Sequence, residues 1–71
     1  MKAKVTVSRD GKVQAEYDTG RITLVGWVQR APRTSRMWMA IRDGGRVVTS
    51  KAKRRSEAVA ALLAFVGIEA A

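Results

Sequence analysis

A hairpin predicted over residues 21–42 constrains the fold more than any other stretch of the chain. Its sequence is RITLVGWVQRAPRTSRMWMAIR, and Pro32 opens its turn. A four-residue loop over residues 31–34, built around a type I turn, would place Arg30 opposite Ser35. In that register the numbers of any two facing residues sum to 65.

The same register gives the two faces of the hairpin different characters. Side chains alternate between faces along a strand, so Trp27 would lie directly opposite Trp38. Their face also holds Thr23, Val25, Gln29, Arg36, Ala40 and Arg42. The other face is an apolar strip of Leu24, Gly26, Val28, Met37, Met39 and Ile41. We expect a helix to cover the apolar strip, which leaves the tryptophan face as the functional surface.

Residues 2–18 predict a second hairpin. Apolar and polar residues alternate through the segment, and Asp10-Gly11 marks its turn. A two-residue turn would mix the two faces, whereas a three-residue loop with a left-handed Gly11 keeps them apart. That loop places Lys4 opposite Glu16. The expected apolar face consists of Ala3, Val5, Val7, Val13, Ala15 and Tyr17.

The rest of the chain predicts a short strand and a helix. Residues 46–49 have the pattern of a fifth, basic edge strand after a glycine-rich turn. Apolar residues recur at helical spacing over residues 56–66, with Ser56 as the expected N-cap and Gly67 as the stop. The segment between them, residues 50–55, fits either a basic linker or an additional first turn of the helix.

These elements predict a single α+β domain over residues 1–71. We expect an antiparallel meander of four or five strands within residues 2–49, with the C-terminal helix packed on one face. The chain of 71 residues is close to the lower limit for a single stable core. From Ala58 to Val66 the helix has no polar residue. Both a lone covering helix and a helix buried on two sides in a homodimer fit this pattern.

Basic charge is concentrated in the middle of the chain. The protein has 14 Lys and Arg against 6 Asp and Glu, for a net charge of +8. Residues 21–55 hold ten of the cations, eight of them arginine, and one anion, which gives this segment +9. Solubility does not require such a concentration, and arginine suits phosphate groups. We therefore expect nucleic acid as the partner.

Other functional classes are not indicated by the sequence. Cysteine and histidine are absent, so the usual zinc ligands are missing, and we expect neither a metal nor a cofactor. The acidic residues lie mostly at turns or opposite cations, without a recognisable catalytic pair, which argues against an enzyme with a small-molecule substrate. The longest apolar run, residues 58–66, is too short to span a membrane. We expect a cytoplasmic protein.

Residues 25–66 combine a basic turn, the motif W-x-A-x-R-D-G-G, a short strand and the motif S-E-A-V-A-A-L. This order resembles the arm-type DNA-binding domains of tyrosine integrases and the related plant ethylene-response domains. The resemblance implies a three-stranded sheet that is backed by a helix and inserts one face into the major groove. It also implies a reading face of Arg36, Trp38, Ala40 and Arg42.

The extra N-terminal hairpin departs from that family. So does Arg54, which stands where a threonine commonly caps the helix. The longer sheet and the expected dimer are similar to single-strand binders of the Whirly and positive-cofactor coactivator types, a resemblance that rests on architecture.

We predict nucleic-acid binding, with DNA favoured over RNA, through the sheet face opposite the helix. The two tryptophans could contact bases or sugars, form a dimer interface, or belong to the core if a bulge occurs at Gly26. The alternative function is a regulatory module, such as a host-targeting inhibitor, that docks a Trp/Arg patch on an acidic protein. The candidate binding residues are Trp27, Gln29, Arg30, Arg33, Arg36, Trp38, Arg42, Arg46, Lys51, Lys53, Arg54 and Arg55.

Overall fold

The computed structural model describes residues 2–70, without the side chains of Thr34 and Ser35. The elements of this part are β1 (Lys2–Val7), β2 (Lys12–Glu16), β3 (Ile22–Ala31), β4 (Thr34–Arg42), β5 (Val47–Ala52), α1 (Arg55–Val66) and β6 (Glu69–Ala70). The strands form one sheet in the order β5-β4-β3-β2-β1-β6. From β1 to β5, each strand lies antiparallel to the preceding one, which confirms the predicted α+β meander.

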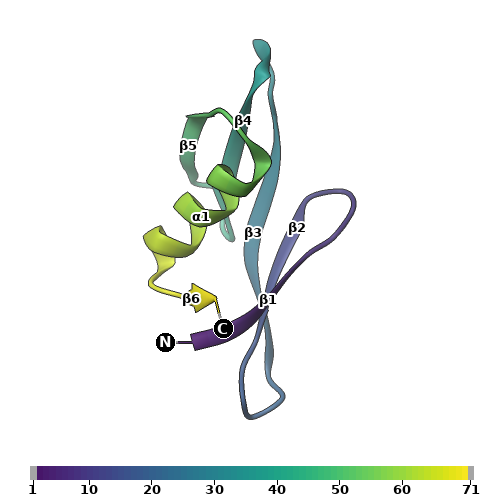
Figure 1. Cartoon of the computed structure of the whole chain (residues 1–71), viewed down its shortest axis with the longest axis vertical. Coiled ribbons are helices and arrows are strands. Elements are labelled where there is room, and N and C mark those ends of the chain that lie inside the picture. Colours follow the sequence, from purple (N-terminus) through teal and green to yellow (C-terminus); the bar gives the residue numbers. More distant parts are fainter. Residues whose placement is uncertain (1, 71) are drawn as a thin grey trace.

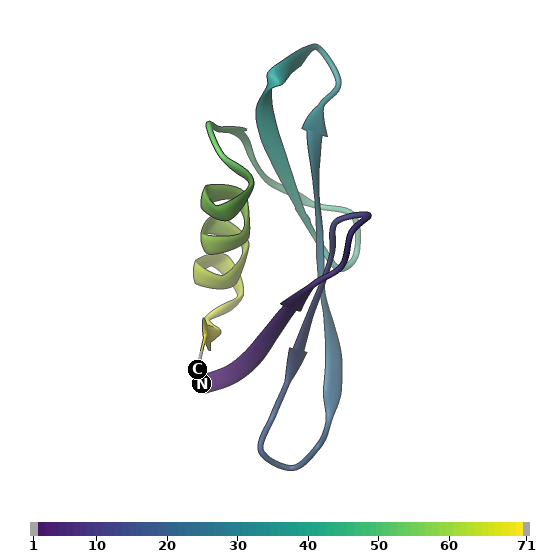
Figure 2. The ribbon, with the colours of Figure 1, turned by 45° about the vertical axis from the view of Figure 1, so that its right-hand side comes forward.

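The molecule is elongated, with principal extents of 40 × 20 × 19 Å. α1 packs against β3, β4 and β5 (Figure 1). Figure 2 shows that the β3–β4 hairpin continues past the helix and ends in a projecting tip. We call the projecting part of this hairpin, residues 30–38, the arm.

The N-terminal hairpin has the register that its loop chemistry predicts. Lys4 faces Glu16, and Gly11 is left-handed, with a φ of 96°. Gly11 is buried against β3, where its carbonyl oxygen accepts a hydrogen bond of 2.8 Å from the Val28 N–H. A Cβ at Gly11 would lie 2.0 Å from the carbonyl oxygen of Val28, so this close approach requires glycine.

The predicted register of the β3–β4 hairpin is wrong. The tip pairs as expected, but the register then shifts, and Arg30 faces Trp38 instead of Ser35. The three extra residues, 35–37, all belong to β4, and facing numbers sum to 68 along the rest of the hairpin. Because the shift is an odd number of residues, the β4 side chains from Trp38 to Arg42 lie on the face opposite to the predicted one, relative to β3.

A second irregularity lies at Gly26 in β3. The register between β2 and β3 shifts by one residue there, which makes Val25 the extra residue of a bulge. Val25 and Val28 are three positions apart, and the bulge lets both reach the buried core. A Cβ at Gly26 would lie 2.1 Å from the carbonyl oxygen of Ile41, so glycine allows β3 and β4 to approach.

The core lies between α1 and one face of the sheet. Ala40 of β4 is fully buried, and Trp38 of the same strand packs partly buried against the core. The helix therefore covers the face of β4 that the sequence predicts to be exposed, and that prediction is wrong. The predicted apolar face of the N-terminal hairpin does face the core. The core residues are Ala3, Val13, Ala15, Val25, Val28, Ala40, Ala52, Ala58, Leu62 and Leu63.

α1 begins one residue earlier than predicted. Its N-cap is Arg54, which makes no side-chain capping hydrogen bond, so the predicted cap at Ser56 is wrong. The carboxylate of Glu57, in the first turn, accepts a hydrogen bond of 3.0 Å from the Lys53 backbone N–H. Gly67 ends the helix with a left-handed φ of 77°, as predicted.

Strand pairing also extends beyond the prediction. β5 continues to Ala52, so half of the 50–55 segment is strand, an assignment outside the two expected alternatives. After α1 the chain forms β6, which runs parallel to β1 and places Glu69 opposite Lys2. The sequence does not predict β6.

Candidate nucleic-acid interface

One end of the molecule brings cations of two chain segments together. Trp38 of the arm faces Ala52 of β5. A hollow of about 270 Å³ is lined by Ala31, Pro32 and Arg33 of the arm together with Ser50 of β5. The connection from β5 to α1 therefore lies beside the arm. We call this end the arm surface, which consists of Arg30, Arg33, Arg36, Trp38, Lys51, Lys53, Arg54 and Arg55.

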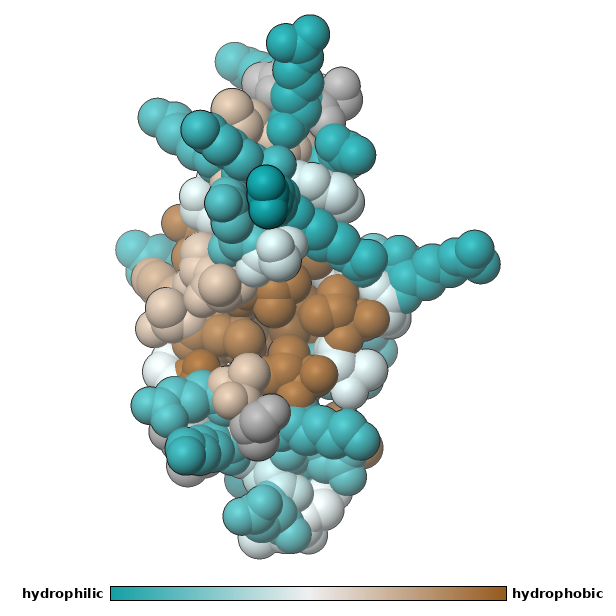
Figure 3. Space-filling model, in the orientation of Figure 1, coloured by the Kyte–Doolittle hydropathy of each residue, from teal (hydrophilic) through white to brown (hydrophobic). Residues whose placement is uncertain are grey.

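The arm surface is strongly cationic. Its cations are solvent-exposed, except for Arg55, which is partly buried. Glu57 lies at its border and uses its carboxylate on the backbone of Lys53. Figure 3 shows hydrophilic side chains projecting from this end of the molecule, at the top of the view. Clustered charges of one sign create a positive potential at this end of the molecule.

Within the arm surface, Arg30 and Trp38 form a stacked pair. They face each other across the strands, and the Arg30 guanidinium carbon lies 4.6 Å from the centroid of the Trp38 ring. That distance is typical of a cation–π interaction. Trp38 also packs against the core. The same side chain therefore contacts both the core and Arg30 of the cationic surface.

Three of the four residues that the integrase resemblance assigns to a reading face, Trp38, Ala40 and Arg42, are not on the outer face. Ala40 is fully buried, and the guanidinium carbon of Arg42 lies 5.8 Å from the ring centroid of Phe65 on α1. Trp38 packs on the same side, and Arg36 lies in the irregular part of the arm. The chain does have three antiparallel strands backed by a helix, but the side chains of Trp38, Ala40 and Arg42 are turned toward that helix.

Trp27 lies on the opposite face of the sheet from Trp38. It is paired with Lys12 on one side and with Ile41 on the other, and Ile41 is paired with Val47. Gln29 is on this face too, opposite Met39. The predicted pairing of the two tryptophans is therefore wrong, because the shifted register separates them.

Arg42 and Arg46 do not belong to the arm surface. They flank the turn between β4 and β5, where the Arg42 N–H donates a hydrogen bond of 2.9 Å to the Arg46 carbonyl oxygen. This turn is at the end of β4 remote from the arm. Of the twelve candidate residues, eight belong to the two segments that meet at the arm surface, and Trp27, Gln29, Arg42 and Arg46 lie outside these segments.

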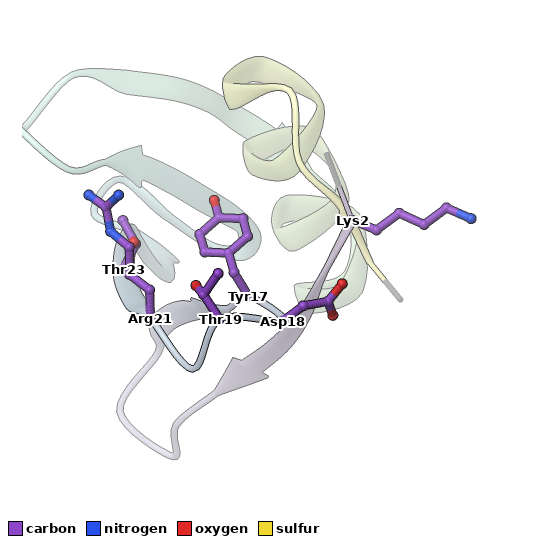
Figure 4. A pocket seen from close by; sticks show the side chains of 6 residues that line it. All are labelled: Lys2, Tyr17, Asp18, Thr19, Arg21 and Thr23. Carbon is purple, nitrogen blue, oxygen red and sulfur yellow. The ribbon is translucent and has the colours of Figure 1, made fainter.

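Another hollow, of about 540 Å³, lies at the turn between β2 and β3. Figure 4 shows the Tyr17 ring in its middle and the Lys2 side chain pointing away from it. Its charged lining residues are Lys2, Arg21 and Asp18, a mixture of both signs. No group of three or more His, Cys, Asp and Glu among residues 2–70 could hold a metal ion. We assign no ligand to this hollow.

Sequence reasoning misses two contacts of the arm surface. The Arg30–Trp38 stack depends on the register shift between β3 and β4, and the arm has no glycine from which this shift could be predicted. The Arg55 guanidinium donates a hydrogen bond to the Ser8 carbonyl oxygen, and no local pattern relates residues 47 positions apart.

Comparisons of the chain with protein-family models, curated proteins and solved structures found no match. In the described part of the chain, no helix is long and apolar enough to cross a lipid bilayer.

Proposed function

We propose that the protein binds nucleic acid through the arm surface, with DNA favoured over RNA by the integrase-like resemblance. The observation that carries the proposal is the convergence of two arginine- and lysine-rich segments at one end of the molecule. The hollow shared by Arg33 and Ser50 joins the arm to the start of the second segment. A folded chain would thus present as one surface the cations of two segments, residues 30–36 and 51–55, that the sequence holds apart.

The shape of the arm supports the same partner. The major groove of B-DNA admits a two-stranded β-ribbon, and the arm is such a ribbon, projecting past α1 (Figure 2). Arg33 and Arg36 are exposed on it and carry the planar donors that suit phosphates and guanine edges. Lys51, Lys53 and Arg54 are exposed on the neighbouring segment and would contact the phosphates that flank the arm.

The face opposite the helix supports binding less well. Trp38 and Arg42 are on the other side of the sheet, and Trp27 is bordered there by Ile41. The contact with nucleic acid would therefore lie at the arm surface, which includes eight of the twelve predicted residues, and not on the face opposite the helix.

The salt dependence of binding tests the proposal. We expect the affinity for duplex DNA to fall with salt, with a log–log slope of roughly −0.9 for each phosphate contacted. Replacing Arg33, Arg36, Lys51 and Lys53 by Gln should flatten this slope. A matched control removes the same charge elsewhere, through Gln at Lys4, Lys12, Arg21 and Arg46.

The comparison of the two variants decides the outcome. The arm variant should lose more of the slope than the control, because its cations are clustered. Equal losses would show that binding follows net charge and would remove the arm surface from the proposal. Parallel titrations with single-stranded DNA, RNA and an unrelated acidic protein identify the preferred polyanion.

A further inference from the structure

The outer edge of β1 is only partly covered. Among the described residues, β6 pairs with Lys2 and Ala3, and no other strand lies on that side of β1. Within the part of the chain that the structure describes, residues 4–7 therefore form an open strand edge. At a rise of about 3.3 Å per residue, this edge is roughly 13 Å long.

The backbone groups on this edge can be assigned from the hairpin. The Ser8 N–H donates a hydrogen bond of 2.9 Å to the Lys12 carbonyl oxygen, next to the loop. Bonded and non-bonded pairs alternate in an antiparallel ladder, so Thr6 directs its N–H and C=O toward β2. Val5 and Val7 direct theirs to the open edge, where they are ready to pair with another extended chain.

An apolar groove accompanies the open edge. A hollow of about 430 Å³ is lined by Val7 of β1 and by Arg55, Ser56 and Val59 of α1. Val5, Val7 and Val59 are partly buried and pack against the core. The hydrophobic area in the middle of Figure 3 lies over α1 and β1. The hydrogen bond from Arg55 to the Ser8 carbonyl closes one end of the groove.

We propose that this edge binds an extended, acidic segment of another protein, which adds to β1 as a strand. Strand addition supplies affinity through the backbone, and alternate side chains supply specificity. Side chains next to Val5 and Val7 would enter the groove and contact Val59, so they should be apolar. Side chains on the other face would lie next to Lys4 and should be acidic. The expected partner thus alternates apolar and acidic residues.

Charge favours an acidic partner over a second copy of this chain. Lys4 and Arg9 are exposed near the two ends of the open edge, and the net charge is +8. A second copy would bring the same cations to its partner, and lysine on an edge strand disfavours self-pairing. An acidic strand neutralises them instead. This inference does not rest on the proposed function, because the groove beside β1 and the arm surface share Arg55 alone, and no variant that tests this inference changes Arg55.

The test is an NMR titration of the full chain with a capped peptide of alternating Glu and Val. A peptide about eight residues long spans the open edge. We expect amide shifts to concentrate at Val5, Val7 and Val59. The same peptide with Lys in place of Glu should bind at least about tenfold more weakly, and equal binding would overturn the charge argument.

Variants of both partners test the strand addition. Val5→Pro removes a backbone N–H that points to the open edge and leaves the hydrogen bonds between β1 and β2 intact, so peptide binding should weaken about tenfold. The control variant, Thr6→Ala, should bind the peptide like the original chain. N-methylation of the peptide tests the same bonds without altering the protein: methylated valines should block antiparallel addition, and methylated glutamates parallel addition.

Binding unaffected by both methylated peptides would overturn the proposal. So would shifts confined to other surfaces. Shifts of Val5 and Val7 that depend on protein concentration, in the absence of peptide, would identify a second copy as the occupant and overturn the acidic partner. The affinity of Val5→Pro for duplex DNA should be unchanged, which separates this test from that of the proposed function.

Discussion

The guanidinium of Arg55, the first residue of α1, donates a hydrogen bond to the backbone carbonyl of Ser8, which directly follows β1. The helix otherwise packs mainly against β3, β4 and β5. This bond therefore ties the N-terminal hairpin to the helix start and closes the groove between them.

Loss of this tie should destabilise the fold. Arg55→Ala removes a partly buried, charged donor, so we expect the free energy of unfolding to fall by about 1.5–3 kcal/mol. The neighbouring Arg54 is exposed, and Arg54→Ala should change it by no more than about 0.5 kcal/mol. Urea unfolding measures both, and equal effects would contradict a specific role for the bond.

A comparison of Gly11→Ala with Gly20→Ala distinguishes two reasons for a glycine: close packing against a neighbouring strand and a left-handed backbone conformation. Both glycines have a positive φ, 96° at Gly11 and 83° at Gly20. A Cβ added at Gly11 would lie 2.0 Å from the Val28 carbonyl oxygen, whereas a Cβ added at Gly20 would have no such neighbour within 4 Å. Gly20→Ala should cost about 1–2 kcal/mol through the left-handed conformation. Gly11→Ala should cost about 1–3 kcal/mol more because β2 must move away from β3. Thermal melts of the two variants give the comparison, and similar melting temperatures would argue against tight packing of the loop.

In the loop of the first hairpin, we expect the Asp10 carboxyl to have a lowered pKa. A hydrogen bond from the Ser8 hydroxyl lowers the pKa of Asp10 below its ordinary value of 3.8. A carboxyl whose pKa is lower in the folded state stabilises the fold above the unfolded pKa, and this contribution is lost as the pH falls through the folded value. NMR titration of the Asp10 carboxyl should show a rise in its pKa in Ser8→Ala and no change in Ser56→Ala. An unchanged pKa in Ser8→Ala would assign the shift to another group.

The homodimer stays a prediction, and the end of α1 is where we expect it to form. Phe65 and Val66 are 49% and 37% exposed there, although Phe65 lies under the Arg42 guanidinium. Sedimentation equilibrium at micromolar concentration should return more than the monomer mass of 7.8 kDa. Phe65→Lys should restore the monomer, while Ile22→Lys, at a 62% exposed position on β3, should not. A monomer mass for the original chain would rule this contact out.

Local chemistry predicts the first hairpin because two signals agree. The alternation of apolar residues and the conformational demand of Gly11 select the same register, and Lys4 faces Glu16 as expected. The end of the helix is predicted for a similar reason, since Gly67 adopts the left-handed conformation there.

The second hairpin shows where such reasoning stops. Its turn around Pro32 is consistent with the observed tip, but residues 35–37 form an irregularity that carries no glycine or other marker. Apolar residues occur on both faces of β4, Trp38 and Ala40 on one and Met37, Met39 and Ile41 on the other, so the pattern tolerates either orientation. Burial of the small Ala40 side chain under α1 decides between them.

The other features that the sequence does not predict depend on contacts between residues far apart in the chain. β6 is two residues long and pairs in parallel with β1, too short for any periodic pattern. The start of α1 at Arg55 coincides with the bond to Ser8, which a local capping rule at Ser56 does not include. Both cationic segments can be recognised in the sequence. That the segment of residues 51–55 lies beside the arm depends on the path of β5, which the sequence does not predict.

The separation of the two tryptophans gives the protein a built-in pair of optical reporters. Since Trp38 lies under Arg30 and Trp27 beside Ile41 on the other face, the two indoles sample different surroundings. Trp27→Phe would leave an emission signal that responds to ligands at the arm surface. Trp38→Phe would leave one that responds to events on the opposite face. A fluorescence titration with each variant can therefore locate a bound molecule on one side of the sheet without any attached dye.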